Sequence, residues 1–162
     1  MNPRREAYLR SILPEGARLE NMLQPRDREE LQSDYKRVIK IANDFLTGRV
    51  GLLGASRAFC IMSVHVDVEA EEEFNLFTEI AEDSRDLPIG SDREFYAYNG
   101  SDEDLKLASE KLEAQYGAAA RAAAQSLMKK FRVVSEQADP PNGGPANHLE
   151  NSGADGGPLS VI

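Results

Sequence analysis

Apolar residues recur every three or four positions along most of the first 131 residues of the chain. The clearest stretch is 27–46, where successive apolar residues lie four, three, four and three positions apart. This spacing places their side chains on one face of an α-helix. The face consists of Leu31, Tyr35, Val38, Ala42 and Phe45. We therefore expect an amphipathic helix here, with Gly48 as the left-handed residue that ends it.

Three shorter segments, 4–13, 52–65 and 71–82, show the same helical period. The first ends before Pro14 and Gly16, which favour a turn. The second runs into a valine-rich stretch that could instead form a strand, and we expect an extended conformation after residue 65. The third begins with three consecutive glutamates, whose charge suits the amino-terminal end of a helix dipole.

The last periodic segment, 101–131, gives the strongest helix prediction. Ser101 can cap its amino terminus, and three acidic residues follow directly. Two runs of three alanines give the middle of the segment a high intrinsic helix propensity. The predicted apolar face consists of Leu105, Ala108, Leu112, Tyr116, Ala119, Ala123, Leu127 and Phe131.

Together these segments predict an all-α protein, a small bundle of four to five helices formed by residues 1–134. The connection 84–100 contains proline and glycine and is expected to be irregular, with a short extended segment near 95–98. Residues 139–158 hold four prolines and five glycines and no aromatic residue. Such a composition buries too little apolar area to offset chain entropy, so we expect 135–162 to be a disordered tail.

The charge of the chain is concentrated in one segment. The net charge is −9, and residues 67–94 alone, with eleven acids and two arginines, carry the same value. This field repels nucleic-acid phosphates and anionic membranes, and it attracts a basic protein. We therefore expect neither a nucleic acid nor a membrane as partner. The sequence shows no secretory signal or membrane-spanning run, which favours a cytoplasmic location.

Candidate chemistry is sparse, and we expect no metal, no cofactor and no catalytic residue. The acids from Asp67 onward have calcium-loop spacing, but Glu72 stands where the loop needs glycine and Thr78 where it needs glutamate. Three glycines at 48, 51 and 54 lack the lysine of a phosphate loop. The single cysteine, Cys60, lies in an apolar helix and is predicted to be a buried small hydrophobe.

A turn motif follows the acidic helix. In the run Asp86-Leu87-Pro88-Ile89-Gly90, aspartate can accept backbone hydrogen bonds, proline fixes one φ angle and glycine permits a positive one. The motif predicts a defined turn that packs Leu87 and Ile89 inward. A recognition loop is the alternative.

The stretch 45–131 resembles an uncharacterised family of small, acidic, helical bacterial proteins. The shared pattern is a glycine-containing helix start, an acidic run, Phe-x-x-Phe-x-x-Ile, an acidic turn, Asp-x-Leu-Pro-x-Gly and a long final helix. Here it falls on Gly48 to Gly54, Glu71 to Glu73, Phe74, Phe77, Ile80, Asp83 to Asp86, Leu87, Pro88, Gly90 and the segment 101–131. Phe95 and Tyr96 stand where the family has a tryptophan or a similar aromatic residue shortly after the turn. The resemblance implies an immunity or partner-binding protein and supplies no catalytic residue.

The sequence therefore favours an acidic protein-binding module, such as an immunity or inhibitor protein that neutralises a basic toxin or enzyme. In such binders charges steer the encounter, while buried aromatic residues carry most of the affinity. The predicted binding residues are Glu71, Glu72, Glu73, Phe74, Asp83, Asp86, Phe95, Tyr96 and Tyr98. The alternative for this set is a core role for Phe74 and a solubilising role for the acids.

Two other functions remain open. One is a helical-bundle enzyme or small-ligand-binding protein that uses carboxylates, which predicts a pocket holding two or more acids with raised pKa. The other is a structural homodimer formed through the alanine-rich helix at 105–131.

Overall fold

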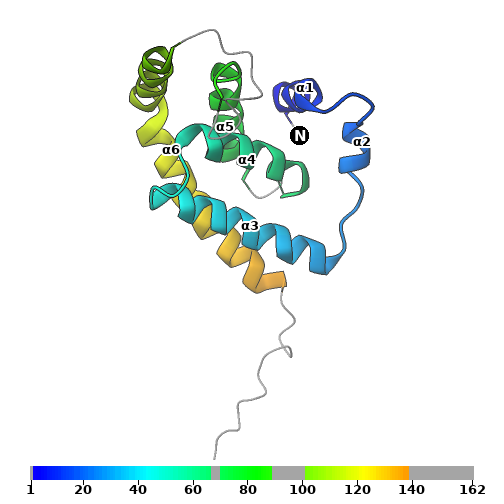
Figure 1. Cartoon of the computed structure of the whole chain (residues 1–162). Helices are drawn as coiled ribbons and strands as arrows, with labels where there is room; N and C mark the ends of the chain where they lie inside the picture. The colour runs from blue at the N-terminus through cyan, green and yellow to red at the C-terminus, as the bar shows by residue number, and fades with distance from the viewer. Residues whose placement is uncertain (1, 67–69, 89–100, 139–162) are drawn as a thin grey trace, which may run out of the picture.

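Six helices form the part of the chain that this computed structural model describes, residues 2–66, 70–88 and 101–138 (Figure 1). In chain order they are α1 (Pro3–Ile12), α2 (Leu19–Met22), α3 (Arg28–Leu46), α4 (Leu52–Val66), α5 (Glu71–Asp83) and α6 (Asp102–Ala138). These ranges contain no strand, so the predicted all-α class is confirmed. An extended segment was expected just after residue 65, but Val66 is helical and residues 67–69 lie outside the described part. The extended segment expected at 95–98 also lies outside it.

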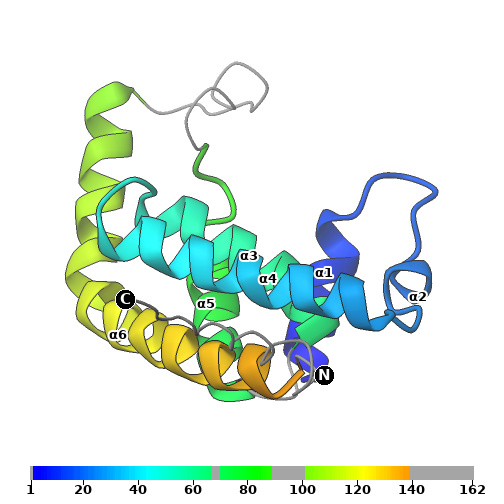
Figure 2. The ribbon, with the colours of Figure 1, turned by 90° about the horizontal axis from the view of Figure 1, so that it is seen from below.

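The long helices α3 and α6 pack along each other, and α4 and α5 pack together beside them. Figures 1 and 2 show the amino-terminal turns of α6 running in a different direction from the rest of that helix. Helix α1 contacts α4 and α5 and lies across the molecule from those turns in both views. None of the helices in the described ranges has the length and apolar character needed to cross a membrane.

Both ends of α3 follow from local sequence. At its start the Glu30 amide donates to the Asp27 carboxylate, and the Asp27 amide donates to the Glu30 carboxylate, at 2.9 Å each. This reciprocal pair satisfies two amides that the helix leaves without backbone partners. At its end Gly48 has a φ of +80°, as predicted. The Gly48 amide donates to Phe45 and the Arg49 amide to Asp44, which caps the last carbonyls.

Helix α6 begins as predicted and ends later than predicted. The Asp104 amide donates to the Ser101 hydroxyl at 3.1 Å, and the Ser101 amide donates to the Asp104 carboxylate at 3.0 Å. The helix continues to Ala138, past the expected domain end at residue 134. Ser135 and Gln32 of α3 exchange two hydrogen bonds of 3.0 Å, which hold these last turns against the bundle. Residues 139–162 lie outside the described part.

The buried face of α6 differs in part from the predicted face. Ala119 is exposed, and the neighbouring Ala120 is completely buried. Ala123 and Ala124 are buried as well, and α3 is the helix that packs most extensively along α6. Three alanines of the helix face that was a candidate for a homodimer therefore contribute to packing within the chain, whereas Ala118, Ala119 and Ala122 are exposed. Small side chains at these positions allow the close approach of the two helices.

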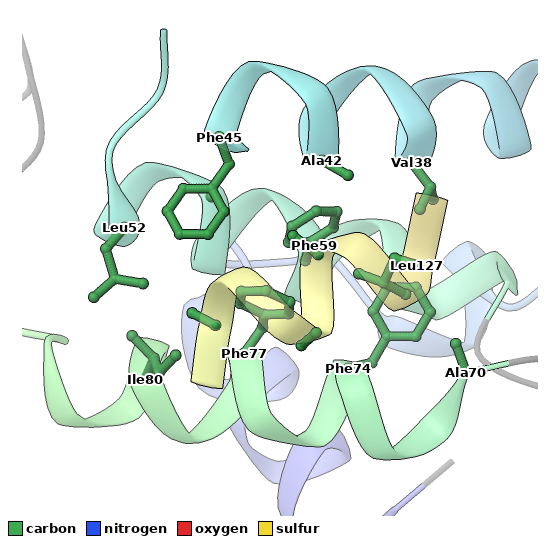
Figure 3. Packing of buried hydrophobic residues seen from close by; sticks show 14 of the residues in the cluster. Val38, Ala42, Phe45, Leu52, Phe59, Ala70, Phe74, Phe77, Ile80 and Leu127 are labelled. Atoms are coloured by element: carbon green, nitrogen blue, oxygen red, sulfur yellow. The ribbon is translucent and has the colours of Figure 1, made fainter. Parts of the chain in front are cut away.

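The main core is a group of aromatic rings between α3, α4, α5 and α6 (Figure 3). Phe77 of α5 lies at its centre, with its ring centroid 4.5 Å from that of Phe59 and 6.5 Å from that of Phe45. Phe74 packs on Phe131 of α6 at 6.0 Å. The Phe-x-x-Phe-x-x-Ile pattern of α5 is thus the helical stripe that faces this core.

A second, smaller cluster joins α1 and α2 to α4 and α5. It contains Tyr8, Leu9, Leu19, Cys60, Val64 and Ala81. Helix α2 has only four residues and was not predicted, because one turn is too short to show a helical period. Its single buried side chain, Leu19, anchors the turn in this cluster.

Candidate functional site

Helix α5 and the turn after it carry an acidic surface. Every acid between residues 71 and 88 except Glu73 is exposed or half-buried. We call this set the acidic face, and it consists of Glu71, Glu72, Glu79, Glu82, Asp83 and Asp86. The predicted binding residues Glu71, Glu72, Asp83 and Asp86 all belong to it.

Glu73 was predicted to bind a partner, but the structure places it between α5 and α6. Its side chain is only 8% exposed, and one carboxylate oxygen lies 2.7 Å from Lys130 Nζ and 2.6 Å from Ser126 Oγ. Burial would raise the pKa of Glu73, but the hydrogen bonds from Lys130 and Ser126 outweigh burial and lower it. Glu73 is therefore a structural residue that ties two helices together.

The predicted aromatic anchors are also redistributed. Phe74 has no exposed surface and packs in the main core, so its assignment as a surface anchor is corrected. Phe95, Tyr96 and Tyr98 lie outside the described residues. The candidate site is therefore built from carboxylates and from neighbouring groups that the sequence analysis did not single out.

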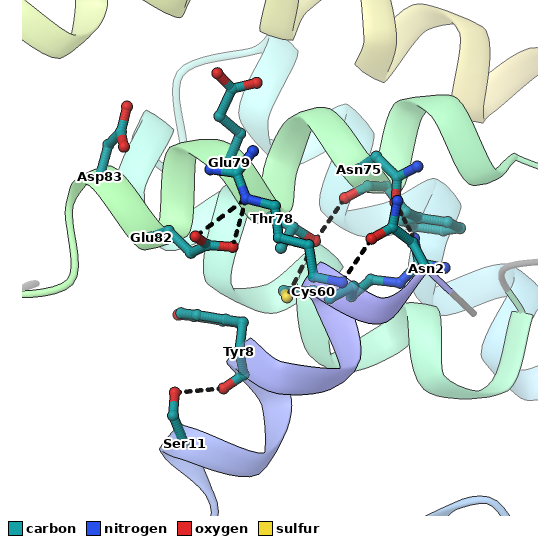
Figure 4. Close-up of polar contacts among 12 residues, drawn as sticks. Asn2, Tyr8, Ser11, Cys60, Asn75, Thr78, Glu79, Glu82 and Asp83 are labelled. Carbon is teal, nitrogen blue, oxygen red and sulfur yellow. Dashed lines mark hydrogen bonds and ion pairs between the residues drawn. The ribbon is translucent and has the colours of Figure 1, made fainter.

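Part of the acidic face is neutralised by α1. The guanidinium of Arg4 donates to both carboxylate oxygens of Glu82, at 3.0 and 3.1 Å (Figure 4). Arg5, which is fully buried, lies 4.0 Å from Glu71. Figure 4 shows that the side chains of Glu82 and Asp83 point to different sides of the end of α5. Asp83 therefore points away from the Arg4–Glu82 ion pair.

Asp83 is held by a residue of α6. The hydroxyl of Tyr116 donates to an oxygen of Asp83 and lies 3.5 Å from Glu79. Burial, followed by the hydrogen bond to Asp83, raises the pKa of Tyr116. Tyr116 therefore stays protonated and keeps donating. By contrast, Glu72 and Asp86 make no hydrogen bond or ion pair with residues in the described ranges.

Arg57 of α4 fixes the turn that follows α5. One guanidinium nitrogen donates to the carbonyl oxygen of Ser84 at 2.7 Å and also to that of Leu87. The Leu87 amide closes the turn with a 3.0 Å bond to Ser84. Leu87 is half-buried and Pro88 is buried, but Asp86 accepts no hydrogen bond from a described residue, so the turn is held by Ser84 and Arg57 and not by the predicted aspartate. Ile89 and Gly90 lie outside the described residues.

Arg57 was missed as a positioning residue by sequence reasoning. The available signal was a lone basic residue within the apolar helix 52–64. A buried or half-buried arginine needs several acceptors for its five donors, and backbone carbonyls at a turn provide them.

Asp83 and Asp86 share a pocket of about 400 Å³ with residues of α6, which we call the α5–α6 pocket. The remaining lining residues are Leu87, Ala108, Lys111, Leu112 and Gln115. Leu87, Ala108 and Leu112 are half-buried or buried and give the pocket apolar walls, while Lys111 and Gln115 are exposed. Two carboxylates thus lie beside an apolar surface that a ligand can cover.

Two further cavities lie elsewhere. One of about 340 Å³ lies between α1 and α5 and includes Arg4, Asn75 and Glu79. Another, of about 680 Å³, lies where the α3–α4 turn faces α6 and includes Phe45, Leu53 and Arg121. Arg121 pairs with Glu113 and lies over the ring of Phe45, so its charge is already engaged.

The described residues include one thiol, that of Cys60. Cys60 is buried, and its sulfur lies 3.5 Å from the Thr78 hydroxyl. Burial raises the pKa of this thiol, which keeps it protonated and unreactive. Within the described residues, no group of three or more His, Cys, Asp or Glu side chains could hold a metal ion.

Comparisons with protein-family models, with curated proteins and with solved structures give no match for this chain.

Proposed function

We propose that the protein is a binding module that captures a basic protein through its acidic face. The observation that carries this proposal is the placement of the acids of α5. Of the seven acids between residues 71 and 88, six reach the surface of one helix and its turn, and the one basic residue among them, Arg85, stacks on Tyr8 of α1. A concentrated field of one sign accelerates the encounter with an oppositely charged partner.

A basic toxin or enzyme that an immunity or inhibitor protein neutralises in the cytoplasm fits this chemistry. Such a partner presents lysine and arginine side chains around its own functional cleft. The acidic face would cover that cleft and block it. This identity rests on the charge of the face and on the family resemblance of 45–131.

The proposal is tested by capture from the native host with a variant of the face that carries fewer charges. The variant Glu72→Gln, Glu79→Gln, Asp86→Asn removes three charges and leaves the Tyr116–Asp83 contact intact. The matched control, Glu15→Gln, Glu110→Gln, Glu136→Gln, removes three exposed charges elsewhere. We expect wild type and control to retain the same basic protein at low salt and the face variant to lose it.

Salt provides a second check on the same capture. Interactions between exposed charges are screened beyond about 8 Å at physiological ionic strength. Retention by the wild type should therefore fall as salt is raised. A partner that binds the face variant as well as the wild type, or binds independently of salt, would overturn the proposal.

The enzyme or ligand-binding alternative predicted carboxylates with raised pKa. The surroundings lower the pKa of three carboxyl groups, those of Glu20, Glu73 and Asp104. A general acid at neutral pH needs a displacement in the other direction. These three carboxyl groups are therefore not suited to act as general acids at neutral pH.

A further inference from the structure

We propose that the α5–α6 pocket is the specificity site of the acidic face and that it receives one arginine side chain of the basic partner. This inference rests on the proposed function, because it names the group by which that partner is recognised. The α5–α6 pocket holds two predicted binding residues, Asp83 and Asp86, and neither forms an ion pair with α1 in the described part of the chain.

The charge of the pocket matches a single cation. Two carboxylates, Asp83 and Asp86, face one basic side chain, Lys111, so the pocket carries one net negative charge. Asp86 makes no ion pair with a described residue, and Lys111 makes none either. An incoming cation therefore finds a carboxylate whose charge is not yet engaged.

The walls of the pocket favour arginine over lysine. Leu87, Ala108 and Leu112 form apolar surface beside the carboxylates. A guanidinium is planar and weakly hydrated, so its faces can lie on apolar groups while its edge donates two hydrogen bonds to a carboxylate. An ammonium group is strongly hydrated and loses more by entering such a pocket.

The pocket is also largely formed before binding. Tyr116 holds Asp83, and Arg57 fixes the turn that carries Asp86 and Leu87. A preformed site loses less conformational entropy when it binds, so a larger share of the contact energy appears as affinity.

The test uses short peptides and the complete chain. The probes are acetyl-Gly-Gly-Arg-Gly-Gly-amide and the same peptide with lysine or norleucine at the centre. Binding is followed by amide chemical shifts in two-dimensional NMR. We expect the arginine peptide to shift the amides of Asp86, Leu112 and Gln115, with an affinity above that of either other peptide.

Variants assign the shifts to the pocket. Asp86→Asn should weaken the arginine peptide by about two- to fivefold, the range expected for one exposed ion pair. Lys111→Gln removes the opposing charge and should strengthen binding. Glu110→Gln, an exposed neighbour outside the pocket lining, is the matched control and should change little. Circular dichroism of each variant confirms that the fold is retained.

The outcomes separate this inference from the proposed function. Equal binding of the arginine and norleucine peptides, or shifts confined to other surfaces, would overturn the arginine pocket. A second result would also overturn the arginine pocket: the triple face variant loses the basic partner, but Asp86→Asn retains it as well as the wild type does. That result would leave the proposed function intact. Failure of the face variant to lose the partner would overturn both.

Discussion

At the scale of single residues, the acids of α5 divide into two kinds with different physical roles. Glu73 shares the helical face of Phe77 and Ile80 and is buried against Lys130 and Ser126. Asp86 is exposed and makes no contact of this type with a described residue. The charge of a residue alone does not distinguish the two roles, because Lys130, the ion-pair partner of Glu73, lies 57 positions further along the chain.

Replacement of Glu73 by glutamine should destabilise the fold in a way that depends on pH. The folded state lowers the pKa of Glu73 below its ordinary value of 4.5, so its contribution is complete above that value and disappears as pH falls through the folded pKa. We expect the free energy of unfolding to fall by about 1 kcal/mol at neutral pH. This is the contribution of one charge-assisted hydrogen bond, reduced because Lys130 is partly exposed to solvent.

Urea unfolding of wild type and Glu73→Gln at pH 7 and at about pH 3 measures this difference. The difference between the urea midpoints of the wild type and Glu73→Gln should be smaller at the lower pH. Glu136→Gln serves as the control because Glu136 is exposed. A gap that is equal at both pH values would contradict a stabilising role for the ionised Glu73.

At the scale of elements, the sequence predicted five of the six helices closely, because each buries a stripe with the helical period. The end of α3 was predicted from Gly48, whose role depends on local backbone geometry. The capping role of Asp27 at the start of α3 was not predicted. Helix α2 and the last turns of α6 were not predicted. Helix α2 is too short to show a helical period. The last turns of α6 are held by a contact between Ser135 and Gln32, which no local sequence pattern reveals.

Gly48→Ala should destabilise the protein by about 1 kcal/mol, because an L-residue with a side chain is strained in the left-handed region. No atom lies within 4 Å of the added Cβ, so the cost is conformational and not steric. Gly51→Ala is the matched control, since its φ is not positive and its Cβ also meets open space. Thermal unfolding of both variants checks this, and an equal effect at the two positions would contradict it.

At the scale of the whole molecule, the candidate site could be anticipated only in part. The sequence indicated where the acids concentrate, and four of the five predicted carboxylates are on the surface. The pocket beside Asp83 and Asp86 could not be predicted, because it is formed by helices α5 and α6 and by a turn that Arg57 of α4 fixes. A pocket between elements depends on their packing, which the periodicity of each element does not specify.

The folded unit should extend to residue 138. A chain of residues 1–138 should unfold at the same urea midpoint as the full chain, whereas 1–134 should lose about 1 kcal/mol with the two bonds between Ser135 and Gln32. Equilibrium unfolding of the three chains measures this. Equal stability of 1–134 and 1–138 would place the boundary at the earlier residue.

The division of the interior into two clusters has a consequence for how the molecule opens. The smaller cluster attaches α1 and α2 chiefly through α4 and α5, while the aromatic rings around Phe77 remain packed without them. We therefore expect the amino-terminal segment to open as a cooperative unit of its own while the rest stays native. The sulfur of Cys60 lies at that seam, so a thiol reagent would meet it in the partly opened form before global denaturation.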